Sequence, residues 1–328
     1  MRYLKNPSTN PYFNLALDEY AMKHIDCDED FFFLWQNEPS VIIGKNQNTA
    51  EEINQKFIDE KGIKVARRVS GGGAVYHDIG NLNFTFVINV DDPGKVNYKK
   101  FVQPVIDALA SMGVTAEASG RNDILVDGLK ISGNAQRMAN GKLMHHGTLM
   151  FDVDVETLVE ALNVDPDKIT SKGVKSVRSR VTNIKEHLPE GTTLQQFWDA
   201  LQFYLSNEGK DEEIILTDED IAKIEYEAVN RFGTWDWIYG ASPEFNLKNS
   251  KRFPGGRIEV LMHVTDGRID SVRFIGDYLG IEDVEAIEQR MQGTRFNRAD
   301  VTAVFEQFTL NKYFGTITLD EILSVMFD

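Results

Sequence analysis

Apolar residues recur along the first part of the chain with two different periods, and each period predicts a different element. In NPYFNLALDEYAMKH and YKKFVQPVIDALASMG they recur every three to four positions, which predicts helices over residues 10–24 and 98–113. EEINQKFIDEKG has the same period and ends in glycine, so a further helix is expected over residues 51–62. Apolar and β-branched runs predict strands over residues 31–36, 40–45, 63–69 and 81–90. This mixture is typical of an α/β or α+β protein.

The pattern changes after residue 205 and indicates a second unit. Residues 206–227 carry nine acidic and two basic residues, as expected for a solvated segment that ends the first body. Beyond Ser242, RIEVLMHV and SVRFIGD predict two strands joined through TDGRID, and two or three helices complete the chain. We therefore expect a first domain over residues 1–241 and a second over residues 242–328.

Composition and charge limit the classes of protein to consider. The 328 residues are 42% apolar and 26% charged, which is enough for a sizeable core. Cys27 is the single cysteine, which excludes an internal disulfide framework or a cysteine-based zinc cluster and fits a reducing cytosol. No apolar run approaches the roughly 18 residues that cross a bilayer, and the N-terminus has no apolar signal core, so neither membrane insertion nor secretion is expected. A net charge of −16 argues against general affinity for nucleic acid.

Three consecutive glycines follow two arginines in RRVSGGGAVYHD, residues 67–78, between two predicted strands. The glycines precede Ala-Val-Tyr-His, so they lack the Lys-Ser/Thr pair of a Walker A loop, and they lack the G-x-G-x-x-G spacing of a dinucleotide-binding turn. A bend with a bulge would need only one or two glycines. Three glycines beside Arg67 and Arg68 favour, over that alternative, the close approach of an anionic ligand to bare backbone.

The segment RNDILVDGLKISGNAQR, residues 121–137, predicts a hairpin with a two-residue turn at Asp127 and Gly128, both with positive φ. The expected pairs are Val126 with Leu129, Leu125 with Lys130, and Ile124 with Ile131. Lys130 then lies opposite the apolar face of the hairpin and close to Asp123. On this segment alone Lys130 is a solvated strand residue, and it becomes a functional one only if its face lines a cavity.

A strand over GKLMHHGTLMFDVD places His145 and His146 on opposite faces, so the two cannot bind one metal ion together. We expect one of them to line a pocket and the other to be structural.

The segment DKITSKGVKSVRSRVTNIK, residues 167–185, contains six basic residues with no acid after the first position. It is either a solvated loop or a mobile basic loop that closes over phosphate, with Gly173 as a hinge residue.

Together these segments resemble the signature of lipoate-protein ligases. The resemblance is carried by RRVSGGGAVYHDIGNLNFTF, ASGRNDILVDGLKISGNAQR, HHGTLMFDVD and KGVKSVRSRVTNI, in the family's order, and WQNEPSVIIGKNQN and GTWDWIYGASPEF also look like family segments. It covers about residues 10–245, with a compatible small domain after them. The resemblance implies an α+β catalytic domain of the biotin-ligase and lipoate-ligase type, related in fold to class II aminoacyl-tRNA synthetases, followed by an accessory domain.

The resemblance also implies a reaction in two steps. ATP and lipoate would form lipoyl-AMP and pyrophosphate, and the lipoyl group would then pass to a lysine of a carrier domain. The implied cofactors are ATP and Mg²⁺, with lipoate as the substrate. The implied partners are the lipoyl domains of 2-oxoacid dehydrogenase complexes and the glycine cleavage H protein, in the cytoplasm and without nucleic acid or a membrane.

Site residues follow from the resemblance position by position. Lys130 is expected to contact both the lipoyl carbonyl and the phosphate and to stabilise charge in both steps. The other implied roles are ATP or adenylate binding by Arg68, Gly73, Ala74, Val75, Tyr76, Asn122, Asp123 and Lys130; lipoate binding by Ser70, Gly72, Lys130 and His146; closure over the adenylate by Lys172, Gly173, Val174, Lys175, Ser176, Val177, Arg178 and Arg180; and Mg²⁺ ligation by Asp123.

Other functions on the same scaffold are the alternatives. Octanoyl and lipoyl transferases use a thioester on an active-site cysteine and no ATP, whereas Cys27 lies among acids, away from the motifs. A biotin ligase would show a G-R-G-R type loop, which this sequence lacks. A non-catalytic lipoate- or nucleotide-binding regulator is the alternative from another class, and the presence of Lys130 and the glycines weighs against it.

Overall fold

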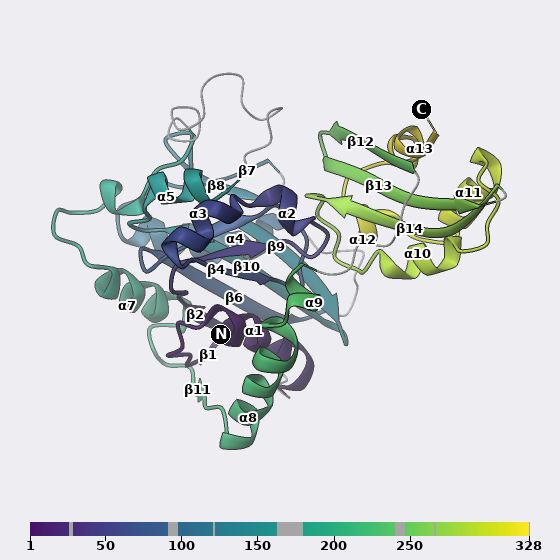
Figure 1. Cartoon of the computed structure of the whole chain (residues 1–328). Helices are drawn as coiled ribbons and strands as arrows, with labels where there is room; N and C mark the ends of the chain where they lie inside the picture. The colour runs from purple at the N-terminus through teal and green to yellow at the C-terminus, as the bar shows by residue number, and fades with distance from the viewer. Residues whose placement is uncertain are drawn as a thin grey trace.

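The computed structural model describes residues 1–25, 29–90, 98–120, 122–162, 180–239, 247–265 and 267–327. They form two bodies, a larger one up to Tyr239 and a smaller one from Leu247 onwards (Figure 1). The expected boundary between residues 241 and 242 lies outside the described residues, and so does Cys27. None of the described helices is both long and apolar enough to cross a lipid bilayer.

A mixed sheet forms the centre of the larger body. Within the described residues its strands are, in spatial order, β11 (Glu213–Ile214), β1 (Arg2–Leu4), β2 (Phe31–Trp35), β6 (Asn81–Asn89), β10 (Lys142–Met150), β9 (Leu129–Ala139), β8 (Asp123–Val126) and β7 (Glu117–Ser119). β1 is parallel to both of its neighbours, and the strands from β2 to β7 pair antiparallel. Every residue of β2 is buried, because helices cover both faces of the sheet.

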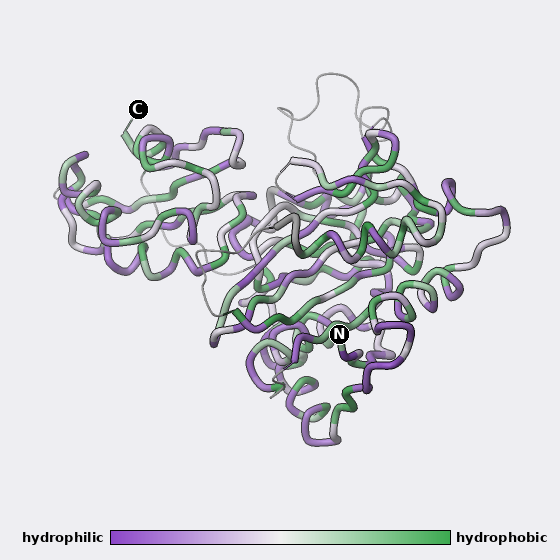
Figure 2. Tube along the Cα trace, turned by 180° about the vertical axis from the view of Figure 1, so that it is seen from behind, coloured by the Kyte–Doolittle hydropathy of each residue, from purple (hydrophilic) through white to green (hydrophobic). Residues whose placement is uncertain are grey.

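Two groups of helices cover the two faces. α4 (Tyr98–Ser111), α7 (Leu194–Leu205) and the 3₁₀ turn η3 (Ile184–His187) lie on one face, and α1 (Pro11–His24), α8 (Asp218–Glu227) and the π-helical turn η4 (Ala228–Phe232) lie on the other. The first face carries Phe84 and Phe86, and the second carries Phe33 and Val87, as the alternation along a strand requires. Figure 2 shows hydrophobic and hydrophilic residues alternating along these helices, as expected for helices with one buried side.

A smaller sheet carries the glycines. β3 (Ser40–Ile43) is its central strand, parallel to β4 (Lys64–Arg67) and antiparallel to β5 (Val75–His77). The glycines lie between β4 and β5 and so link two strands, as expected. The helices associated with this sheet are α2 (Thr49–Glu52), α3 (Gln55–Lys61), α5 (Val155–Ala161) and α9 (Trp235–Ile238).

The single helix expected over residues 51–62 is wrong. Ile53 leaves the helical path and forms a bridge with Leu162, which separates α2 from α3. Asn54 then caps α3 by accepting from the backbone N–H of Phe57, and Gly62 ends it in the left-handed conformation with φ 65°. A contact with a distant part of the chain therefore interrupts a helical period that the local sequence supports.

The smaller body consists of a three-stranded antiparallel sheet and helices. Its strands are β12 (Leu247–Phe253), β13 (Gly256–Thr265) and β14 (Arg268–Gly276), and its helices are α10 (Glu285–Met291), α11 (Arg298–Phe305), α12 (Asn311–Phe314) and α13 (Leu319–Phe327). The two predicted strands are confirmed. The edge strand β12 was not predicted, because its sequence LKNSKRF is mostly exposed and lacks an apolar face. Both bodies are α+β.

Candidate active site

A cavity of about 560 Å³ opens between the large sheet, the glycine bend and the smaller body. Ten residues expected at the site line this cavity: Arg68, Gly72, Gly73, Ala74, Val75, Asn122, Asp123, Lys130, His146 and Arg180. Two do not: Ser70 is buried behind His146, and Tyr76 faces the core on the other side of β5. Lys172, Gly173, Val174, Lys175, Ser176, Val177 and Arg178 lie outside the described residues.

The hairpin that carries Lys130 has the expected turn but not the expected register throughout. Asp127 and Gly128 have φ of 50° and 76°, and Leu125 pairs with Lys130. Beyond that pair a bulge shifts the register, so Ile124 lies opposite Ser132 rather than Ile131. The predicted pairing of Ile124 with Ile131 is therefore wrong, because the sequence pattern does not reveal the extra residue of a bulge.

Lys130 is held on its side chain and on its backbone. Its Nζ lies 2.8 Å from Oδ1 of Asp123, and both side chains are about one-third exposed to solvent. Its backbone N–H donates to the carbonyl oxygen of Arg180 at 2.7 Å, and its carbonyl oxygen accepts from the N–H of Thr182 at 3.1 Å. Arg180 and Thr182, in the described part of the basic segment, are thereby fixed beside the lysine. Lys130 also lines the cavity, which is the condition under which its face of the hairpin could have a functional role.

The three glycines of the bend have different neighbours. A Cβ at Gly71 would lie 2.8 Å from the carbonyl oxygen of Tyr278, in the smaller body. Gly72 has φ of 90°, and its N–H donates to that same oxygen at 3.2 Å. A Cβ at Gly73 would have Cβ of Asp277, at 4.0 Å, as its nearest described neighbour. Two of the glycines therefore allow the smaller body to dock, and the third leaves its backbone open to the cavity.

The adjacent arginines mainly bind the backbone of their own body. Arg67 donates to carbonyl oxygens of residues 44, 45, 47, 237 and 238, which fixes α9 against β4. Arg68 donates to the carbonyl oxygens of Ile42, Gly71 and Gly73 and so sets the shape of the bend. Burial lowers the pKa of each guanidinium to about 10, so both are charged at neutral pH.

A hydrogen-bonded chain runs behind the cavity wall. Nε2 of His146 lies 2.6 Å from Oγ of Ser70, and its Nδ1 lies 2.7 Å from Oδ2 of Asp18 on α1. Asp18 in turn accepts from the hydroxyl of Thr85 at 2.7 Å, and that hydroxyl accepts from the indole N–H of Trp35 at 3.0 Å. All five side chains are buried, so the imidazole of His146 is fixed in orientation.

His145 lies on the opposite face of β10, where its ring stacks on Phe84, Phe86 and Phe101. The expectation that one histidine lines a pocket and its neighbour is structural is confirmed.

The residues that support the site from α1 and from the smaller body were not predicted from the sequence. Asn14 and Asp18 are buried and four residues apart on α1, beside Leu15 and Leu17. Polar residues at helical spacing on an apolar face were the available signal for them. Asp277 lines the cavity from beyond β14, and no local pattern marks it.

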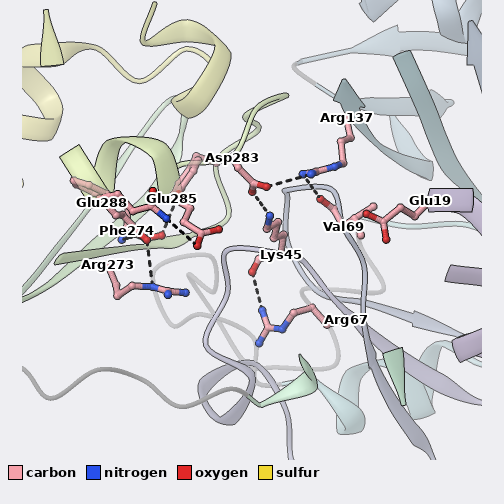
Figure 3. A network of polar contacts seen from close by, with 12 residues as sticks. Glu19, Lys45, Arg67, Val69, Arg137, Arg273, Phe274, Asp283, Glu285 and Glu288 are labelled. Atoms are coloured by element: carbon pink, nitrogen blue, oxygen red, sulfur yellow. Dashed lines mark hydrogen bonds and ion pairs between the residues drawn. The ribbon is translucent and has the colours of Figure 1, made fainter. Parts of the chain in front are cut away.

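An ionic contact joins the two bodies next to the cavity. Asp283 pairs with Lys45 and, at 3.1 Å, with Nη2 of Arg137 (Figure 3). Arg137 also donates to the carbonyl oxygen of Val69, immediately before the glycine bend. The backbone N–H of Met138 donates to the smaller body as well, at 3.0 Å. The docked position of the smaller body is therefore tied to the strands and the bend that shape the site.

The described residues contain no group of three or more His, Cys, Asp or Glu side chains arranged to hold a metal ion. Asp123 is a carboxylate at the cavity, and its observed partner is Lys130. Mg²⁺ in nucleotide sites is commonly bound through one or two carboxylates together with substrate phosphates, so a single carboxylate fits a metal that enters with ATP.

Comparison with known proteins matches both bodies to one family. Residues 10–206 match the family described as "Lipoyl protein ligase A/B catalytic domain", and residues 242–326 match "Bacterial lipoate protein ligase C-terminus". The chain is 47% identical to lipoate-protein ligase LplJ of Bacillus subtilis, over the full length of both chains.

Solved structures agree with this match. The crystal structure of LipL1 of P. falciparum in complex with lipoate has a TM-score of 0.79 at 28% identity and covers 94% of each chain. A lipoate-protein ligase A bound with ATP has a TM-score of 0.63 at 26% identity, covering 73% of this chain and 98% of its own. The chain belongs to the lipoate-protein ligase family.

Proposed function

We propose that this chain is an ATP-dependent lipoate-protein ligase that forms lipoyl-AMP, releases pyrophosphate and transfers the lipoyl group to a lysine of a carrier domain. The observation that carries the proposal is the position of Lys130, whose ammonium group lies at a cavity bounded by both the bare backbone of the glycine bend and apolar side chains. An acyl phosphate needs both kinds of surface at one point, since its phosphate is anionic and its acyl chain is apolar.

In the first step a carboxylate oxygen of lipoate attacks the α-phosphorus of ATP, and the bond to pyrophosphate breaks. Two anions must approach each other, so a fixed cation at the point of contact lowers the barrier. Lys130 supplies this charge, and Asp123 fixes its position. ATP binds with Mg²⁺, for which Asp123 is the proposed protein ligand.

The remaining roles follow from the cavity wall. We assign the phosphates and the adenylate to Arg68, Gly73, Ala74, Val75 and Asn122, and the lipoyl chain to Gly72 and His146. Tyr76 and Ser70 do not line the cavity, so we assign them supporting roles: Tyr76 packs in the core beneath β5, and Ser70 holds the ring of His146. The open backbone of Gly73 supports the first assignment, and the fixed ring of His146 supports the second. Closure over the adenylate by residues 172–180 is supported by the anchoring of Arg180 beside Lys130.

In the second step an acceptor lysine attacks the acyl carbon, and AMP leaves. The partners that fit this chemistry are lipoyl domains of 2-oxoacid dehydrogenase complexes and the glycine cleavage H protein, and the cytoplasm is the proposed location. We take residues 1–241 as the catalytic domain and 242–328 as an accessory domain, supported by the ranges of the two family matches and by α9, which packs on β4. Because Pro254 and Asp277 of the accessory domain line the cavity, its position controls the acceptor's access to the acyl carbon.

The first prediction tests Lys130. Lys130→Ala should reduce lipoate-dependent exchange of radiolabelled pyrophosphate into ATP by on the order of 10² or more, as the loss of a preorganised donor does elsewhere. The fold should survive, since the side chain is partly exposed. Lys56→Ala is the matched control, because Lys56 is a largely exposed lysine on α3. Exchange without lipoate, or a near-normal rate in Lys130→Ala, would contradict the proposal.

A further inference from the structure

His145 is a buried titratable residue to which the reaction described above gives no role. It lies on β10, is 0% exposed, and stacks its ring on Phe84, Phe86 and Phe101. Burial of an imidazole costs free energy unless its nitrogens are hydrogen-bonded, and a phenylalanine would stack on the same three rings without that cost. What the histidine adds at this position is therefore the hydrogen bonding of its two ring nitrogens.

Both ring nitrogens have partners on β9. Nε2 of His145 lies 3.3 Å from Oδ1 of Asn134, and Nδ1 lies 3.0 Å from Nε2 of Gln136. Nδ2 of Asn134 donates to the carbonyl oxygen of Asn122, which settles the orientation of the Asn134 amide. Oδ1 of Asn134 is thus an acceptor, so Nε2 of His145 is the protonated nitrogen and Nδ1 accepts from Gln136.

The ring keeps this single proton at physiological pH. Burial lowers the pKa of His145 to about 3, and the neighbouring His146 acts in the same direction. Nε2 of His145 is therefore a constant donor to Asn134 near neutral pH.

Asn134 connects the ring to the start of β8. Its backbone N–H and its Nδ2 both donate to the carbonyl oxygen of Asn122, at 2.8 and 3.1 Å, and Nδ2 also donates to Oγ of Ser132 at 3.0 Å. In return Nδ2 of Asn122 donates to the carbonyl oxygen of Asn134 at 3.1 Å. These bonds extend the pairing of β8 with β9 by one residue beyond Asp123, where β8 begins. The amide that His145 fixes thus holds Asn122 against β9.

Gly147 leaves room for that amide. It lies opposite Asn134 in the pairing of β10 with β9, and a Cβ at Gly147 would overlap Oδ1 of Asn134 and the ring of Phe84. The three residues of the HHG segment therefore have distinct tasks. His146 lines the cavity, whereas His145 and Gly147 together set the position of Asn134.

The residues held in this way include the neighbours of Lys130. Asn122, Asp123 and Lys130 all line the cavity. Asp123 directly follows Asn122, and its Oδ1 lies 2.8 Å from Nζ of Lys130. A shift of Asn122 would therefore move the backbone of Asp123 and the carboxylate that orients the ammonium group. Misplacement of a reacting group by about 1 Å can cost on the order of 10² in rate.

We propose that His145 is a positioning residue for adenylation, because it holds Asn134 and thereby fixes the strand end from which Asp123 orients Lys130. The inference rests on the proposed function and deepens it. His145 lies outside the cavity wall and touches none of the groups proposed to react, so its effect passes through Asn134. The alternative is that His145 only packs against the aromatic rings around it.

The first test uses two amides that each imitate one ring nitrogen. His145→Gln keeps a donor near the position of Nε2, whereas His145→Asn is one methylene shorter and replaces only the Nδ1 side. His145→Phe keeps the stacking and removes both nitrogens. With ATP at saturation, kcat for lipoate-dependent pyrophosphate exchange should fall about tenfold in the Phe and Asn variants, with KM for lipoate changed less than about twofold, and His145→Gln should keep most of the rate.

Phe101→Leu is the matched control for packing. It removes one of the rings stacked on His145 and leaves the hydrogen bonds in place, so it should lower the free energy of unfolding without lowering kcat. A normal kcat in folded His145→Phe, or equal rates in the Gln and Asn variants, would overturn the inference.

The second test repeats His145→Phe in a Lys130→Ala background. If His145 acts through the position of Lys130, the double variant should exchange no more slowly than Lys130→Ala alone, since the group being positioned is already absent. A purely structural role would slow exchange by the same factor in both backgrounds, and that result would overturn the inference.

A third measurement uses the unsubstituted protein and so does not depend on how the variants fold. Nitrogen-15 spectra of the imidazole of His145 should show a proton on Nε2 and none on Nδ1 between about pH 5 and 9. A proton on Nδ1 would overturn the hydrogen-bonded chain to Asn134. Absence of lipoate-dependent exchange in the unsubstituted protein would instead contradict the proposed function itself, and the spectra would still decide whether the chain exists.

Discussion

At the scale of single residues, the glycine bend performs two tasks that its sequence does not separate. SGGGA suggests one ligand that lies against three bare backbone units. Gly71 and Gly72 instead accommodate the carbonyl oxygen of Tyr278, and only Gly73 faces the cavity without a close neighbour among the described residues. The arginines divide in a similar way, because Arg67 ties the backbone of several loops together while Arg68 lines the cavity. The sequence shows where a glycine or an arginine stands, but it does not show which neighbouring group makes that residue necessary.

The division of tasks among the glycines predicts different effects of adding a methyl group. Gly71→Ala would place Cβ 2.8 Å from the oxygen of Tyr278, so the smaller body should dock less tightly. Gly73→Ala places Cβ at the cavity, so docking should persist while the affinity for ATP or lipoate falls. Small-angle scattering measures the docking, and calorimetry measures the affinities. An increase in the radius of gyration for Gly73→Ala but not for Gly71→Ala would contradict this division.

At the scale of elements, the hydrophobic pattern predicts the strands and helices that have one buried face. α1, β6, β10, β13 and β14 all follow from local periodicity. The features it misses depend on contacts between distant parts of the chain. The bridge of Ile53 to Leu162 breaks a predicted helix, the bulge at Ile124 changes the register near Lys130, and β12 exists because β13 offers an edge. The sequence therefore predicts which helices and strands carry the site residues, but it does not predict the final geometry of the site.

The turn before β9 and the turn after β9 each contain a glycine with positive φ, so a substitution at one can serve as the control for the other. Gly128 and Gly141 have φ of 76° and 73°, and a Cβ added at either one would have no heavy atom of the described residues within 4 Å. Alanine at either position should lower the free energy of unfolding by about 1 kcal/mol through backbone strain alone. Both turns adjoin β9, but Gly128 is next to the end of β9 that carries Lys130 and Gly141 is beyond the other end. Gly128→Ala should therefore also slow adenylation, whereas Gly141→Ala should not. Denaturant unfolding and pyrophosphate exchange test this, and equal slowing by both variants would show that position along the hairpin is unimportant.

At the scale of the whole molecule, three charged side chains hold the smaller body beside the site. Burial lowers the pKa of Lys45, and the positive charge of Arg137 acts in the same direction. Asp283 stands between these two cations, and it is the group that makes their proximity favourable. Burial alone would raise the pKa of Asp283, but the two cations outweigh that effect and the pKa is lowered.

The lowered pKa of Asp283 predicts how docking depends on pH. A carboxyl whose pKa is lower when docked stabilises docking above its ordinary pKa of about 4, and this contribution is lost as the pH falls through the lowered value. Because the side chain of Asp283 is about one-third exposed, salt should weaken the contact as well. Asp283→Asn should reproduce the loosened state at neutral pH, since it leaves Lys45 and Arg137 facing each other without a counter-charge.

The two steps of the reaction should respond differently to this loosening. The groups proposed for adenylation lie in the larger body, so the amount of bound lipoyl-AMP should change little, whereas transfer to a carrier lysine should change because it depends on access past the smaller body. Bound lipoyl-AMP and acceptor lipoylation are measured on the same preparation of Asp283→Asn, with Glu306→Gln, an exposed carboxyl in the same body, as the control. Equal proportional changes in both steps, or a scattering profile identical to that of the unsubstituted protein, would show that the Asp283 contact does not govern the transfer step.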